Sequence, residues 1–112
     1  MARYAELAEN QRRAALESEG VTDPALRRAV FARAVELSGG EAAGTEAIPA
    51  DLRQYVDTVA LHAYRITDED LQALRRAGWS EDAIFEVSVA AAVGAGLARL
   101  ERGLGILRGG ER

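Results

Sequence analysis

His62 is the only histidine of the chain, and its imidazole is the side chain best suited to proton transfer near neutral pH. Tyr55 lies two helical turns before it, on the same face of a helix, and can orient it. Glu86 stands inside an apolar segment, where burial would raise its pKa and make it a partner for His62. These three are the candidate catalytic residues. The more frequent alternative is that His62 packs at a helix end and that Glu86 is a structural acid, and both interpretations stay open.

Four further residues are candidates for a pocket around His62. Arg65 and Arg99 carry the positive charge that would hold a carboxylate substrate. Thr58 and Tyr64 offer hydroxyl groups near the imidazole in the sequence. The expected ligand is therefore a small acidic metabolite.

The overall composition excludes several classes of function. The net charge of −4 and the lack of a basic stripe argue against nucleic-acid binding. Without cysteine there is no disulfide framework, no thiolate zinc site and no thiol peroxidase chemistry. A single histidine leaves a transition metal without its usual ligands, so we expect neither metal nor cofactor. The N-terminus is too charged for a signal peptide, which favours a cytoplasmic location.

The elements that must position these residues are expected to be helices only. The chain of 112 residues is short enough to form one domain, and it is 48% hydrophobic, rich in alanine and only 5% aromatic. Asp23 followed by Pro24 marks a helix start, and Gly39 with Gly40 marks its end. Apolar spacing and such end signals predict an all-α bundle of about five helices, with residues 1–20 forming a loosely packed N-terminal helix.

The stretch "ITDEDLQALRRAGWSEDAIFE", residues 66–86, contains two helix starts in succession. Thr67 and Asp70 have the spacing of a capping box, and Gly78 suits the left-handed end of that short helix. Ser80 then caps the next helix, followed by acids that favour the helix dipole. These signals predict a sharp angle between a short helix and a long one.

The long final helix, residues 81–107, is apolar on nearly every side from Ala83 to Ala98. A helix of this kind must be buried on most sides, and we expect a homo-oligomer in which a neighbouring subunit covers part of it. Ala90, Gly94 and Ala98 recur every fourth residue and would allow close approach of another helix. The apolar run is too short and too rich in glycine and alanine for a membrane span, and it contains Glu86.

The segment "AGWSEDAIFEVSVAAAVGAGLARL", residues 77–100, resembles the C-terminal half of the AhpD-like, or carboxymuconolactone decarboxylase, family. The resemblance extends over residues 50–107 and implies an all-helical homo-oligomer, a trimer or a hexamer. Redox members carry Cys-x-x-Cys-x-x-x-His on the preceding helix. On "YVDTVALH" this motif falls on Tyr55, Thr58 and His62. It therefore implies a small cavity near His62, walled by Tyr55, Thr58 and the start of the final helix.

Departures from the family pattern leave two classes of function open. Both cysteines are absent, and the upstream glutamates, Glu41 and Glu46, lie only near the position of the family's proton relay. The first class is an oligomeric small-molecule-binding or non-catalytic domain. The alternative is a thiol-free lyase or decarboxylase that uses His62 as general acid or base on a small carboxylate or lactone.

Overall fold

The computed structural model describes residues 2–40 and 47–109, and these form an all-α fold. Its helices are α1 (Ala2–Glu17), α2 (Pro24–Leu37), α3 (Ala50–His62), α4 (Asp68–Arg76) and α5 (Glu81–Gly109), with a 3-10 turn, η2 (Ala63–Arg65), after α3. Across these ranges no strand is present. The expected fold class is therefore confirmed.

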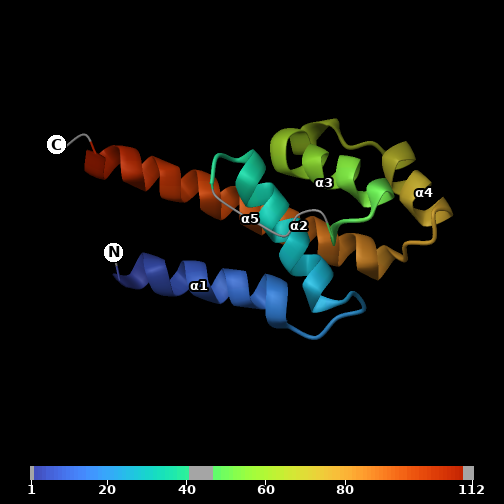
Figure 1. Ribbon diagram of the computed structural model, residues 1–112, viewed down its shortest axis with the longest axis horizontal. Helices are drawn as coiled ribbons and strands as arrows, with labels where there is room; N and C mark the ends of the chain where they lie inside the picture. The colour runs from blue at the N-terminus through green and yellow to red at the C-terminus, as the bar shows by residue number, and fades with distance from the viewer. Residues whose placement is uncertain (1, 41–46, 110–112) are drawn as a thin grey trace.

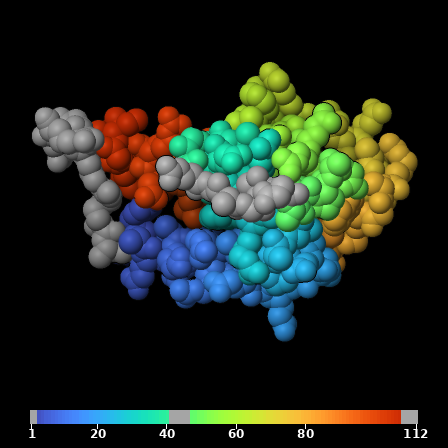
Figure 2. Space-filling model, in the orientation of Figure 1, coloured from blue at the N-terminus to red at the C-terminus, as the bar shows by residue number. Residues whose placement is uncertain are grey.

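Helix α5 is the axis of the molecule. Figure 1 shows α2 crossing it, α1 running antiparallel beside its C-terminal half, and α3 and α4 flanking its N-terminal half. The space-filling view places α1 along one long edge and α3 with α4 along the opposite edge (Figure 2). The extents of 51 × 28 × 23 Å follow from α5, because a helix of 29 residues is about 43 Å long.

The ends of α2 are set by local hydrogen bonds that the sequence predicts. The Asp23 carboxylate accepts from Ala25 N–H at 2.8 Å, with Pro24 at the first helical position. At the other end, Gly39 has φ 95°, and Gly40 N–H donates to the carbonyl of Val35 at 2.8 Å. This is a Schellman ending, for which the left-handed glycine is required.

The two helix starts in residues 66–86 are also confirmed. Thr67 and Asp70 form the full capping box at the start of α4, and the Ser80 hydroxyl accepts from Ala83 N–H at 3.1 Å at the start of α5. Between them Gly78, at φ 106°, ends α4 in a second Schellman turn. These bonds turn the chain sharply and so place α4 opposite α3.

The close helix approach expected along Ala90 and Gly94 occurs within the chain. Both residues are buried, and a Cβ at Gly94 would lie 2.7 Å from the carbonyl oxygen of Phe31 on α2. The expectation that this ridge contacts a neighbouring subunit is therefore corrected, because α2 already covers it. This crossing of α2 and α5 is the most extensive helix contact in the fold.

The opposite face of α5 is uncovered. Phe85 is 68% exposed, and a Cβ at Gly96 or Gly103 would meet nothing within 4 Å. By length and composition, the segment Glu81–Leu107 is long and apolar enough to cross a membrane. Its most apolar stretch of 18 residues has a mean hydropathy of 1.6, and 39% of that stretch is buried in the fold.

Candidate functional site

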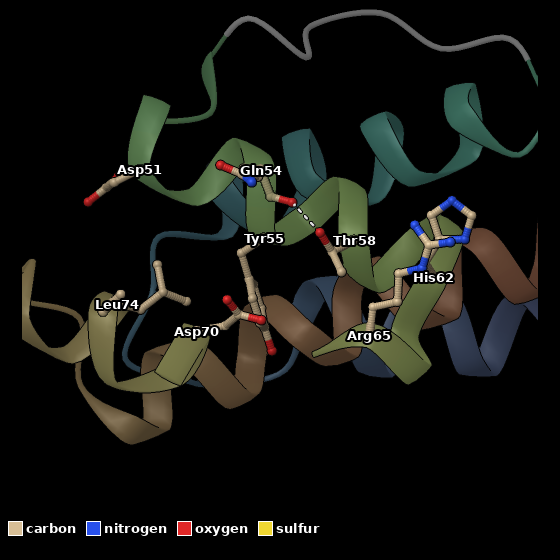
Figure 3. A pocket seen from close by; sticks show the side chains of 9 residues that line it. Asp51, Gln54, Tyr55, Thr58, His62, Arg65, Asp70 and Leu74 are labelled. Atoms are coloured by element: carbon tan, nitrogen blue, oxygen red, sulfur yellow. Dashed lines mark hydrogen bonds between the residues drawn. The ribbon is translucent and has the colours of Figure 1, made fainter. Parts of the chain in front are cut away.

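A groove of about 310 Å³ lies between α3 and α4 and contains His62. Figure 3 shows Tyr55 and Thr58 extending from α3 into the groove, with Asp51 at one end of the helix and His62 at the other. The groove is lined by Asp51, Gln54, Tyr55, Thr58, His62, Arg65, Asp70, Ala73 and Leu74. The five residues from α3 share one face, because their spacing repeats every three or four positions.

The groove has opposite charges at its two ends. His62 and Arg65 lie at the C-terminal end of α3, and Asp51 lies at its N-terminal end (Figure 3). A rise of 1.5 Å per residue separates Asp51 from His62 by about 16 Å along the helix. Asp70 adds a carboxylate from the first turn of α4, the end of that helix that follows η2. The groove can therefore bind a molecule with unlike groups at its ends.

At the basic end of the groove, His62 and Arg65 both lie against the ring of Tyr64. The His62 ring meets the Tyr64 ring edge to face, with centroids 5.9 Å apart, and the Arg65 guanidinium lies 5.6 Å from the centroid of the same ring. Tyr64 itself is 79% exposed. Within the described part of the chain the His62 imidazole makes no hydrogen bond, so both of its nitrogens are available to a ligand.

Both carboxylates already have one partner each. Asp51 accepts from the indole N–H of Trp79 at 2.8 Å, and Asp70 accepts from Thr67 N–H at 3.0 Å in the capping box. These bonds use one oxygen of each carboxylate and hold it in place. The other oxygen of each remains available to a cation or a donor.

Tyr55 forms the inner wall of the groove, as expected, but its hydroxyl is directed to α5. It bonds to Ser88 Oγ at 2.5 Å, and the Ser88 hydroxyl donates to the carbonyl of Ile84 at 2.7 Å. Because Ser88 has one proton and gives it to Ile84, Tyr55 is the donor to Ser88. Tyr55 thus ties α3 to α5 and does not orient His62.

Glu86 lies away from the groove and stabilises the loop between α1 and α2. Its carboxylate accepts from Val21 N–H at 2.8 Å, Thr22 N–H at 2.9 Å and the Thr22 hydroxyl at 2.5 Å. Burial by itself would raise the pKa of Glu86, but these hydrogen bonds and the charge of Arg27 outweigh it and lower the pKa. The direction is opposite to the raised pKa expected from the sequence.

The remaining candidates divide between the groove and the scaffold. Thr58 lines the groove, with its hydroxyl donating to the carbonyl of Gln54 at 2.9 Å. Arg99 donates instead to the carbonyl of Ala60 and so ties α5 to α3. The wall facing Thr58 comes from α4, whereas the sequence suggested the start of α5. Glu41 and Glu46 lie outside the residues that the structure describes.

Sequence reasoning missed three polar residues of the groove, namely Asp51, Gln54 and Asp70. A signal for two of them was present, because Asp51 and Gln54 continue the helical face of Tyr55, Thr58 and His62. Asp70 was expected only as a cap, and its position in the groove depends on the packing of α4 against α3.

A larger hollow of about 680 Å³ lies between α1, α2 and α5. Its walls are mainly alanine, valine, leucine and aromatic side chains, and its cation Arg12 is paired with Glu9 at 3.5 Å. Binding sites need convergent polar groups to orient a ligand. The groove between α3 and α4 has them, and we regard it as the candidate site.

No metal centre is formed by the residues described, since no three histidine, aspartate or glutamate side chains among them come together suitably. The chain matches no family model, no curated protein and no solved structure.

Proposed function

We propose that this protein is a small-molecule-binding domain whose site is the groove between α3 and α4. The ligand is a small carboxylate that carries a positively charged or hydrogen-bond-donating group at its other end. The observation that supports this is the separation of His62 and Arg65 from Asp51 along α3 within one groove of about 310 Å³. That volume is at the lower end of the range for ligand pockets.

Arg65 and His62 would receive the carboxylate. A guanidinium presents two parallel N–H donors to a carboxylate, and an imidazole N–H adds a third. Asp51 would receive the ligand's ammonium or amide donors through its available oxygen. Gln54 and Thr58 lie between the two ends and can bond to a polar middle section.

Binding is favoured over catalysis by the surroundings of His62. A general base is normally held in one orientation by a hydrogen-bonded partner. Neither Tyr55 nor Glu86 supplies this partner, because both are bonded elsewhere. The second candidate function, a thiol-free lyase with His62 as acid or base, is supported by the availability of its imidazole to the groove.

The likeness of residues 77–100 to the AhpD-like family supports, as a further proposal, a distant branch without redox cysteines. It would be a self-associating cytoplasmic protein. This proposal rests on the pattern of residues 50–107 and on the all-α fold. It adds nothing about the ligand, since the groove lacks the residues of thiol chemistry.

The test is an NMR titration with three tetra-alanine probes, whose extended length of about 13–14 Å suits the separation of the two ends of the groove. Tetra-alanine carries both charges, its N-acetyl derivative lacks the ammonium, and its C-terminal amide lacks the carboxylate. We expect tetra-alanine to shift the His62 imidazole signals, which are unique because the chain has one histidine, and each altered probe to bind at least tenfold more weakly. Equal shifts with all three probes, or none, would refute the proposal.

Two substitutions in the groove test whether the ligand binds there. His62→Gln and Arg65→Gln should each weaken binding of tetra-alanine at least tenfold, as followed by backbone amide shifts. Arg76→Gln is the matched control, because Arg76 is an exposed arginine on α4 that does not line the groove. A loss of binding in the control equal to that of Arg65→Gln would place the ligand elsewhere. Turnover of a lactone or carboxylate that His62→Gln abolishes would favour the second candidate.

A further inference from the structure

The uncovered face of α5 carries a continuous apolar stripe. It consists of Phe85, Val89, Ala92, Gly96, Leu100, Gly103 and Leu107. At 3.6 residues per turn these seven positions fall within an arc of about 80°. Except for Val89, which is half-buried, all are exposed, and Leu107 is 70% exposed. The buried face, with Val87, Ala91 and Gly94, lies on the other side of the helix.

Three charged residues of α5 that flank the stripe are held away from it. Arg99 donates to the Ala60 carbonyl on α3, and Arg102 donates to the Ser38 carbonyl at 3.2 Å. Glu86 is bonded to Val21 and Thr22. The stripe therefore presents an uncharged surface, which a folded protein seldom leaves in contact with water over such a length.

In the inner part of the stripe, residues that lie at equal distances on either side of its centre differ in size, so that a large side chain is matched with a small one. Gly96 is the midpoint, and Phe85 and Leu107 lie at equal distances from it in the sequence. Val89 and Gly103 form the next such pair, and Ala92 and Leu100 form the innermost. In both inner pairs a large residue stands opposite a small one.

We infer that α5 pairs with α5 of a second copy of this chain, antiparallel about a two-fold axis at Gly96. In this arrangement Val89 of one copy would fill the space at Gly103 of the other, and Leu100 would lie on Ala92. The two Gly96 backbones would meet at the axis, where a Cβ has open space in the single chain. A parallel pair would instead place Phe85 on Phe85 and leave a gap at Gly103.

The area of the contact fits a weak, reversible dimer. From Phe85 to Leu107 the stripe is about 33 Å long, and two helices in contact over that length bury on the order of 1,000 Å² in all. That is the area at which specific protein interfaces begin. Because the dimer is two-fold symmetric, each copy contributes the same stripe to the interface.

Sedimentation velocity of the full chain tests the pairing. We expect the wild-type mass to rise toward twice 12.0 kDa with concentration. Gly96→Glu should stay monomeric, because it places two carboxylates at the axis. Gly105→Glu is the matched control, since Gly105 also has open space at its Cβ but lies off the stripe. Both substitutions favour helix, so an unfolded variant is not expected. A monomeric wild type, or an assembly that Gly96→Glu leaves intact, would overturn the inference.

A side-chain exchange tests the register. Ala92→Leu and Leu100→Ala should each weaken the dimer at least tenfold, and the double variant should restore it, because it again pairs large with small. Failure of the double variant to recover would overturn the proposed register.

Cross-linking and vesicle binding distinguish a second copy of the chain from a membrane as the partner of the stripe. Because the chain has no cysteine, Gly96→Cys introduces a single thiol, which should form a disulfide-linked dimer on oxidation. Gly105→Cys should not, and equal cross-linking of both would overturn the inference. Flotation with phosphatidylcholine–phosphatidylglycerol vesicles is the competing outcome: a wild-type monomer that floats, and no longer floats as Gly96→Glu, would assign the stripe to a membrane.

Discussion

At the scale of single residues, Glu86 illustrates how a side chain suited to catalysis can serve the fold. Three hydrogen bonds from Val21 and Thr22 hold its carboxylate, and Gly20 leaves room for it: a Cβ there would lie 2.5 Å from a carboxylate oxygen. The residue therefore attaches the loop between α1 and α2 to α5. Replacing it by alanine would leave the buried Thr22 donors without an acceptor and should cost about 1–3 kcal/mol in the free energy of unfolding.

The same contacts predict a pH dependence. The pKa of Glu86 is lower in the folded protein than its ordinary value of 4.5, so its contribution to the free energy of unfolding is fully present above pH 4.5. This contribution is lost as the pH falls through the pKa that Glu86 has in the folded protein. We expect urea denaturation to show a smaller loss of stability on acidification in Glu86→Gln than in the wild type. Glu101→Gln, an exposed acid on the same helix, is the control, and the same flattening there would contradict the assignment.

At the scale of elements, the crossing of α2 and α5 depends on Gly94. A Cβ at this position would lie 2.7 Å from the Phe31 carbonyl and 3.2 Å from the Ala34 Cβ, so the two helices would have to separate. We expect Gly94→Ala to lower the free energy of unfolding by about 1–3 kcal/mol, although alanine is the better helix former.

Gly105→Ala provides the comparison for Gly94→Ala on the same helix. Nothing lies within 4 Å of its Cβ, and the substitution should raise the free energy of unfolding by up to about 1 kcal/mol. Chemical denaturation of both variants measures the difference. If Gly94→Ala were as stable as Gly105→Ala, the close contact between α2 and α5 would be refuted.

At the scale of the whole molecule, stability and self-association should be linked. A partner that binds only the folded chain raises the melting temperature as its concentration increases. Where pairs predominate, we expect calorimetry to show a rise in Tm of about 2–5 °C per tenfold increase in protein concentration. Gly96→Glu should have a Tm independent of concentration. A constant wild-type Tm would argue against pairing through α5.

Part of the candidate site could be predicted from the sequence. Tyr55, Thr58, His62 and Arg65 were expected around one pocket, and they line the same groove. Their common position follows from one helix and the turn after it, since helical spacing alone places them on one side. Glu86 and Arg99 were expected there too, but their partners come from other helices, and no local pattern identifies those partners.

The sequence by itself determined three helix starts and two helix ends. Asp23, Thr67 and Ser80 cap helix starts, and Gly39 and Gly78 end helices, because each acts through hydrogen bonds to residues close along the chain. Only the tertiary structure decided which face of α5 is covered. Gly94 and Gly96 are alike in an apolar helix, yet one lies against α2 and the other against open space. That difference arises from the angle at which two helices distant in sequence cross, and periodicity within a single helix does not contain it.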